Sequence, residues 1–404
     1  MKKLITCFTC LFLILSGSVA NAADSISEAF TSGKAHLNFR YRLETVDQDG
    51  LSKDATASTL RTRLNFKTDP YKGFNLFVEM DDVTYLGDTN FANFRNDKLG
   101  VYPVVADPKG TDINQVYFDF KGEKALFRIG RQRINMDNQR FIGGVGWRQN
   151  EQTYDSANLI FTGLTDSVVT YTYTDNVSRI FGPEKGTPAK DLEASNHTLH
   201  YKYSKDGFGS LVGYGYLLDF DDAIAFSTQT FGLRYAHSFK LDGGMSIPLV
   251  LEYADQEDYG DSPRDYSADY YVIETGLNMP AVKFGIGYEV LGGNASTPGE
   301  QFITPLATLH KFQGWADKFL ATPNAGIEDL YFSVKGKLFT TNVSVIYHDF
   351  SAEDGAADYG NEIDIAISRK FSDHWSVLLK YARYSEDGLF SDTDKLWLMV
   401  TAKF

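Results

Sequence analysis

Cysteine is almost absent from this chain of 404 residues. Its two cysteines, Cys7 and Cys10, both lie in the first 22 residues. That segment has the pattern of a secretory signal peptide: two lysines, an apolar run, and the small-residue motif Ala-Asn-Ala ending at Ala22. We expect cleavage after Ala22, which leaves a mature chain, residues 23–404, without disulfides or thiol chemistry.

Long hydrophobic runs are also missing after residue 22, where no stretch approaches the roughly 18 apolar residues of a transmembrane helix. Basic residues are a minority there, with 37 Lys and Arg against 53 Asp and Glu, a net charge of −16. This balance argues against a nucleic-acid partner. Proline is scarce, whereas 14% of the residues are aromatic and 35 are glycine, a composition that fits a β-rich secreted chain.

The last nine residues, LWLMVTAKF, alternate between two sets of side chains and end on Phe404. Alternation with period two places the two sets on opposite faces of a β-strand. Bacterial outer-membrane barrels typically end on such a strand with a terminal aromatic residue, which the barrel-assembly machinery recognises. We therefore predict that this machinery is a partner and that it reads Phe404.

The same alternation recurs along the chain in segments of about ten residues, such as AHLNFRYRLE and LRTRLNFK, which is the signature of a transmembrane β-barrel. We count eighteen such strands, joined alternately by short turns and long loops. The sequence therefore predicts an all-β fold: one antiparallel barrel over residues 23–404, with short periplasmic turns and long extracellular loops. We expect it in the outer membrane, in contact with lipid and lipopolysaccharide, with an aqueous channel inside.

Basic side chains are predicted to line this channel. On the inward strand faces we place Arg40, Arg42, Arg61, Arg63, Arg128, Arg234, Lys335, Lys337 and Lys380. We expect water to solvate this wall and its charge to attract anions. The alternative is that these charges pair with inward-facing acids across the lumen.

The segment from Arg128 to Asp155 is rich in Arg, Gln and Asn and connects two of the predicted strands. Arg131, Arg140 and Arg148 offer forked donors for carboxylates, and Trp147 offers a flat apolar face. This combination suits an acidic sugar whose ring stacks while its carboxylate is bound. A loop held inside the barrel by Arg–acid pairs is the alternative, and both can hold together.

The longest loop, residues 291–327, interrupts the β pattern. Residues 304–320 carry apolar side chains at spacings of three and four, which predicts an amphipathic helix. We expect it to lie against the barrel mouth or inner wall and to narrow the channel, with His310, Lys311 and Trp315 at the constriction. A helix that only braces the outer loops is the alternative.

No catalytic pattern emerges. The seven histidines are scattered, none lies in a serine-centred motif, and G-x-S-x-G is absent. We predict no enzymatic activity, no cofactor and no metal site.

Two segments, GRQRINMDNQRFIGGVGWRQNEQTYD (residues 130–155) and TPLATLHKFQGWADKFLATPNAGIEDLYF (residues 304–332), resemble segments typical of the alginate export family of outer-membrane proteins. The resemblance implies a monomeric eighteen-stranded barrel with an electropositive lumen, and it places Arg131, Arg140 and Arg148 near the constriction. It also implies passage of anionic solutes, acidic sugars or polyuronate chains by passive diffusion. Unlike the best-known exporters, this chain has only short periplasmic turns, so a general uptake porin for small solutes is the alternative.

Overall fold

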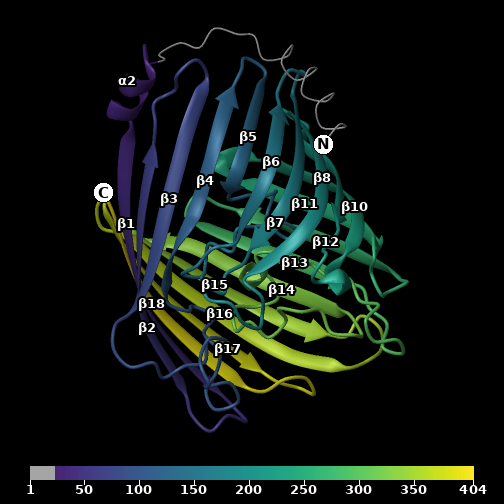
Figure 1. The fold of residues 1–404 in the computed structure, drawn as a ribbon. Helices are drawn as coiled ribbons and strands as arrows, with labels where there is room; N and C mark the ends of the chain where they lie inside the picture. Colours follow the sequence, from purple (N-terminus) through teal and green to yellow (C-terminus); the bar gives the residue numbers. More distant parts are fainter. Residues whose placement is uncertain (1–22) are drawn as a thin grey trace.

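A computed structural model of the chain describes residues 23–404, so the predicted signal peptide lies outside the described residues. Eighteen antiparallel strands form a single sheet, and β1 pairs with both β2 and β18, which closes the sheet into a barrel (Figure 1). The predicted all-β, eighteen-stranded barrel is confirmed. A closed sheet leaves no edge strand, so every strand has a hydrogen-bonding partner on both sides.

The strands are β1 (Lys34–Gln48), β2 (Ala55–Lys67), β3 (Phe74–Tyr85), β4 (Gly110–Lys121), β5 (Ala125–Gln132), β6 (Thr153–Phe161), β7 (Ser167–Ser178), β8 (Asp191–Lys205), β9 (Gly209–Leu218), β10 (Thr228–Lys240), β11 (Ser246–Asp258), β12 (Ser267–Asn278), β13 (Val282–Leu291), β14 (Ile327–Leu338), β15 (Thr341–Ser351), β16 (Asp358–Lys370), β17 (Trp375–Ser385) and β18 (Thr393–Lys403).

Short helical elements accompany the barrel. The α-helix α2 (Ile26–Thr31) precedes β1 and is capped by Ser25, whose hydroxyl accepts the backbone N–H of Glu28. Three 3₁₀ turns lie between strands: η1 (Ile224–Phe226), η2 (Asp242–Gly244) and η3 (Leu309–Lys311). None of the helices within residues 23–404 is long and apolar enough to cross a membrane.

Turns and loops alternate along the chain as predicted. Short connections, such as residues 122–124 between β4 and β5, form one rim of the barrel, which we call the short-turn rim. Long connections, such as residues 86–109 between β3 and β4, form the opposite rim, the long-loop rim. Two loops of the long-loop rim do not stay outside but fold into the barrel, as their contacts show below.

The two faces of each strand differ as the alternation requires. On the outer face large apolar side chains are exposed, for example Leu64 (51%) and Phe118 (56%). On the inner face of β1, Arg42 and Glu44 are fully buried. An apolar outer band and a polar interior match the two environments of a membrane barrel, because lipid contacts one face and the lumen the other.

The predicted helix over residues 304–320 is wrong. Only the three residues of η3 are helical there. Gln313, Gly314 and Asp317 adopt positive φ angles of 48°, 77° and 62°, which a right-handed helix cannot accommodate. The apolar side chains of this segment do not form one stripe but pack at separate points, where tertiary contacts outweigh local periodicity.

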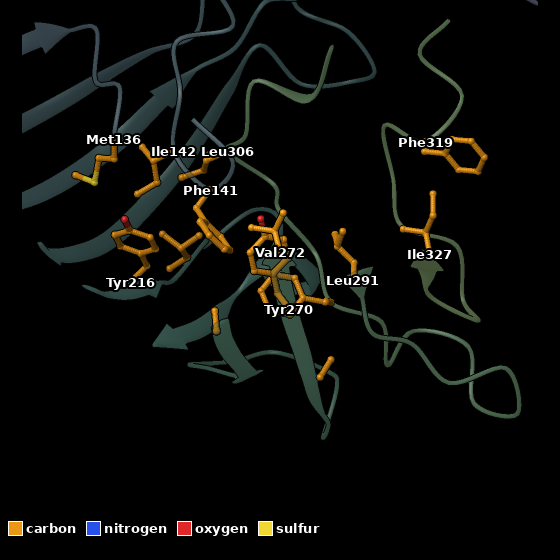
Figure 2. Packing of buried hydrophobic residues seen from close by; sticks show 14 of the residues in the cluster. Met136, Phe141, Ile142, Tyr216, Tyr270, Val272, Leu291, Leu306, Phe319 and Ile327 are labelled. Atoms are coloured by element: carbon orange, nitrogen blue, oxygen red, sulfur yellow. The ribbon is translucent and has the colours of Figure 1, made fainter. Parts of the chain in front are cut away.

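A hydrophobic cluster lies inside the barrel, between the folded-in loops and the wall. Phe141 packs against Tyr214 and Tyr270, with ring centroids 5.4 and 5.2 Å apart, and Leu306 is 2% exposed. Figure 2 shows Phe141 and Leu306 close together beside Tyr270. Each such side chain contributes roughly 1.5–3 kcal/mol by leaving water, so this cluster stabilises the loops in the lumen.

Candidate functional site

Two loops meet inside the barrel. The first inner loop, residues 133–152, connects β5 and β6, and the second inner loop, residues 292–326, connects β13 and β14. The backbone N–H of Gly143 donates to the carbonyl of Leu306 at 2.9 Å. A Cβ at Gly143 would overlap the hydroxyl of Thr308, so only glycine permits this approach. The two loops therefore form a single inner layer across part of the lumen.

Glu151 fastens the first inner loop to the wall. Its carboxylate accepts from Arg63 at 2.8 Å and from Arg133 Nε at 2.6 Å, and Arg61 lies 3.6 Å away. Burial alone would raise the pKa of Glu151, but the three guanidinium groups outweigh burial and hold it well below its ordinary value. Arg63 also binds Asp81, with Nε 2.6 Å from the carboxylate. This cluster is a buried ion-pair network rather than a free basic surface.

Two further arginines of β1 hold the same loop. Arg40 donates to the side-chain oxygen of Gln149 and to the carbonyl of Gly146, both at 2.9 Å. Arg42 donates to Asp107 at 3.1 Å, and its guanidinium carbon lies 4.4 Å from the ring centroid of Trp147. The hydrogen-bond acceptors of Arg40 are neutral, so its positive charge has no carboxylate in direct contact.

Lys380 of β17 sits in an aromatic enclosure. Its ammonium lies 3.6 Å from the ring centroid of Trp315, 4.3 Å from that of Trp147 and 5.3 Å from that of Trp397. It also contacts His310 Nε2 at 2.6 Å. Because Trp147 and Trp315 come from the two different inner loops, the lysine connects both loops to the wall through cation–π contacts.

Asp317 of the second inner loop gathers three donors. Its carboxylate contacts His310 Nδ1 at 2.6 Å, Lys395 Nζ at 2.8 Å and Arg148 Nη2 at 2.9 Å. Burial raises the pKa of Asp317, but these partners outweigh burial and hold it well below its usual range. Burial also lowers the pKa of His310, to about 3, so its imidazole is neutral at pH 7.

A vestibule of about 640 Å³ opens beside Asp317 on the long-loop rim. Its apolar lining includes Phe94, Tyr102, Phe181, Leu320 and Phe390. Its charged lining is four cations, Arg148, Arg179, Lys318 and Lys395, against the single carboxylate of Asp317. Within residues 23–404, no carboxylate lies within 4.0 Å of Arg179 or Lys318. The vestibule is therefore both apolar and electropositive.

The remaining predicted side chains are spread over the lumen. Arg128 pairs with Asp119 at 2.5 Å, Arg140 with Glu289 at 3.0 Å, and Arg234 with Glu252. Lys335 and Lys337 are exposed and line a cavity of about 370 Å³ at the short-turn rim. Lys311 is exposed and donates to the carbonyl of Asn138 at 2.8 Å. Permeation along these groups stays a prediction.

Arg131 is a correction. It was expected in the constriction, but it shares its strand face with Ile129, which is 47% exposed on the outer surface. Its guanidinium pairs with Asp155 at 2.8 Å across the strand pair. Alternation on β5 therefore directs Arg131 away from the lumen, because it lies an odd number of residues from Arg128.

The expectation of a water-solvated basic wall is also wrong for the central residues. Arg42 is fully buried, Arg61 is 5% exposed and Lys380 is 6% exposed. The two inner loops cover them, which alternation within strands could not indicate. The alternative interpretation, in which lumenal charges pair with one another, is confirmed for the arginines that contact Asp81, Asp119, Glu252 and Glu289.

Asp317 and Lys395 were missed by the sequence analysis. Lys395 lies two residues before Trp397, so the alternation of β18 was a usable signal for its inward position. Asp317 carried no such signal, because its neighbours were expected to be helical.

Comparisons with known proteins agree with this fold. Residues 32–168 match the model of the alginate export family. The structure is similar to OpdL of Pseudomonas aeruginosa (TM-score 0.69, 15% identity, 93% of this chain and 99% of that chain) and to OccAB2 of Acinetobacter baumannii (TM-score 0.71, 15% identity, 93% and 99%). This chain has the fold of an outer-membrane porin. It is also similar to OpdK of Pseudomonas aeruginosa crystallised with vanillate (TM-score 0.67, 14% identity, 92% and 98%).

No curated protein matches the chain. The family match confirms the predicted resemblance to the alginate export family over residues 32–168. The match and the porin fold together place the barrel in the bacterial outer membrane as a channel surrounded by membrane lipid.

Proposed function

We propose that this barrel is a passive-diffusion channel for small anionic solutes, with acidic sugars as the preferred class and no enzymatic role. The observation that carries the proposal is the vestibule, where four cations face one carboxylate. A cleft with an excess of one charge and low-dielectric walls concentrates the opposite ion. Anions that enter from the long-loop rim can reach this local excess of positive charge.

The vestibule also favours solutes with an apolar or ring-shaped body. Phe94, Tyr102 and Phe181 line it beside the cations, so a ring can stack while its carboxylate meets a base. Its volume falls in the range of about 300–1,000 Å³ that is common for small-molecule sites. OpdK, whose fold is similar, was crystallised with vanillate, an aromatic carboxylate, which supports carboxylates as the solute class.

Passage of whole polyuronate chains is the second candidate. The match of residues 32–168 to the alginate export family favours it. The two inner loops argue against it, because Gly143 and Leu306 join them inside the lumen where a chain would have to thread. Monomeric uronic acids and short oligomers fit the vestibule without moving both loops.

We also propose partners and an oligomeric state for the barrel. We propose that it acts as a single-domain monomer, because its sheet is closed and needs no second copy to satisfy an edge strand. Phe404 is 54% exposed beside His374, accessible to the barrel-assembly machinery. Lipopolysaccharide around the long-loop rim completes the proposed surroundings.

Reversal potentials across a planar bilayer under a salt gradient test the proposal. The wild-type channel should prefer chloride over potassium, and Arg179→Met combined with Lys318→Met should reduce that preference. Lys185→Met, which neutralises an exposed lysine of the loop that also carries Arg179, is the matched control and should change little. Cation selectivity of the wild-type channel would refute the proposal. Entry of uronic acid monomers, but not long polyuronates, into liposomes separates the two candidates.

A further inference from the structure

We propose that Asp317 occupies a carboxylate-binding site within the channel, and that a permeating carboxylate displaces it. This inference rests on the proposed anion channel and adds the site at which its solute is held. When no solute is bound, the carboxylate of Asp317 occupies the position that the carboxylate of the solute would take. Its side chain leaves the site when a solute carboxylate enters.

The site is built from three separate elements around one carboxylate. Arg148 comes from the first inner loop, Lys395 from β18 and His310 from the second inner loop. All three place donor nitrogens within 3.0 Å of the oxygens of Asp317, and the side chains of Arg148, Lys395 and His310 are 6–7% exposed. Two charged donors and one neutral donor therefore bind a single carboxylate. An acid at the protein surface does not need so many protein donors, because water solvates it.

Two of the three donors, Arg148 and His310, also contact groups other than Asp317. Arg148 also contacts Glu44 at 3.2 Å. Lys380 Nζ lies 2.6 Å from His310 Nε2, and when it donates a hydrogen bond to this nitrogen the imidazole proton lies on Nδ1, facing Asp317. The aromatic rings of Trp147 and Trp315 fix Lys380 in turn. The site is therefore preorganised and keeps its shape when its occupant changes.

The side chain of Asp317 can leave the site at a small cost in free energy. The adjacent residues have their own anchor, because Glu362 accepts the backbone N–H of Ala316 at 2.7 Å and that of Trp315. Rotation of the side chain does not require the second inner loop to detach. Exchange of one carboxylate for another also keeps the charge of the site constant, so no cation is left buried without a partner.

The path to the site is open from the vestibule. Asp317, Arg148 and Lys395 all belong to its lining, together with Lys318, the residue after Asp317. Lys318 Nζ lies 3.5 Å from the hydroxyl of Ser391. A solute carboxylate can therefore meet Lys318 first and then pass to Arg148 and Lys395.

Block of the chloride current by acetate, a small carboxylate probe, tests the inference. Asp317→Asn keeps the shape of the side chain and removes its charge, so the acetate concentration for half-block should fall at least tenfold. Asp317→Asn combined with Lys395→Met removes one cation as well and should return the value toward that of the wild type. Asp261→Asn, at an exposed acid of another loop, is the matched control. Heat-modifiable migration in detergent gels verifies that each barrel is folded.

Equal half-block concentrations for Asp317→Asn, Asp261→Asn and the wild type would overturn the inference. If Asp317→Asn does not fold, amide hydrogen exchange of the wild-type protein tests the displacement instead. Acetate should raise the exchange rate at residues 317–320, whereas chloride at equal ionic strength should not. Unchanged exchange would then refute displacement. Cation selectivity of the wild type contradicts the proposed function instead, so the two failures are distinguishable.

Discussion

Glu151 offers the sharpest perturbation of the constriction. Replacing it by Gln keeps the shape of the side chain but removes the carboxylate that Arg61, Arg63 and Arg133 share. Arg61 then loses its carboxylate partner, and Glu79, 3.7 Å from Arg63 and 3.3 Å from Arg133, is the shared counter-charge that remains for these two. We expect the first inner loop to detach from the wall more often while the barrel, held by its backbone ladder, stays intact.

The magnitude follows from the burial of the partners. Removing one member of a buried ion pair costs about 3–5 kcal/mol. We take the lower end, about 3 kcal/mol, because Arg133 is 30% exposed and because Arg63 keeps Asp81 as a partner. Since each 1.4 kcal/mol is a factor of ten, the population with a detached loop should rise roughly a hundredfold.

Single-channel recording in planar bilayers measures this population as the frequency and duration of high-conductance openings. Glu184→Gln, at an exposed glutamate of another loop, is the matched control. Unchanged openings in a folded Glu151→Gln barrel would refute the argument that Glu151 holds the loop. Acid should not mimic the substitution above pH 5. The pKa of Glu151 is lower in the folded protein than its unfolded value of about 4.3, so the ionised carboxylate stabilises the attached loop fully above that unfolded value. This stabilisation disappears only as the pH falls through the lower pKa of the folded state.

Two further predictions concern the second inner loop. Burial, with a smaller contribution from Lys395, lowers the pKa of Lys318 to about 8, so this lysine loses its charge as the pH rises from 7 to 9. Anion selectivity, measured as reversal potential, should fall over that range in the wild type and stay flat in Lys318→Met; a flat wild-type profile would contradict the assignment. Gly143→Ala should separate the two inner loops and cost about 1–3 kcal/mol in loop stability, measured as faster proteolysis of the loops, because its Cβ would overlap Thr308. Gly213→Ala, where the nearest side chain is 4.0 Å away, should not change proteolysis, and equal rates would refute the steric argument.

Strand positions were predictable because the period of a β-strand is a local property. Arg40 and Arg42 on β1, and Arg61 and Arg63 on β2, face inward as the alternation required, because the members of each pair lie two residues apart. The strand count and the alternation of short turns and long loops followed from the same pattern and from turn residues. Arg131 shows the limit, because motif resemblance assigned it to the lumen although its parity on β5 directs it outward.

The loops were not predictable in the same way. The spacing of apolar residues in 304–320 matched a helix, yet Leu306 packs beside the first inner loop and Phe319 beside Phe350, 4.6 Å between ring centroids. These contacts join residues more than thirty positions apart, and no local period encodes them. The positive φ angles at Gln313 and Asp317 follow from that packing.

The sequence by itself determined a closed eighteen-stranded barrel, the inner and outer faces of its strands, and which loops are long. Only the tertiary structure decided that two of these loops turn inward, that Glu151 and Asp317 each gather three donors, and that most central arginines are paired and buried. The reason is physical: strand periodicity and turn chemistry act over a few residues, whereas a charge cluster forms between groups that only the closed barrel brings within 3–4 Å.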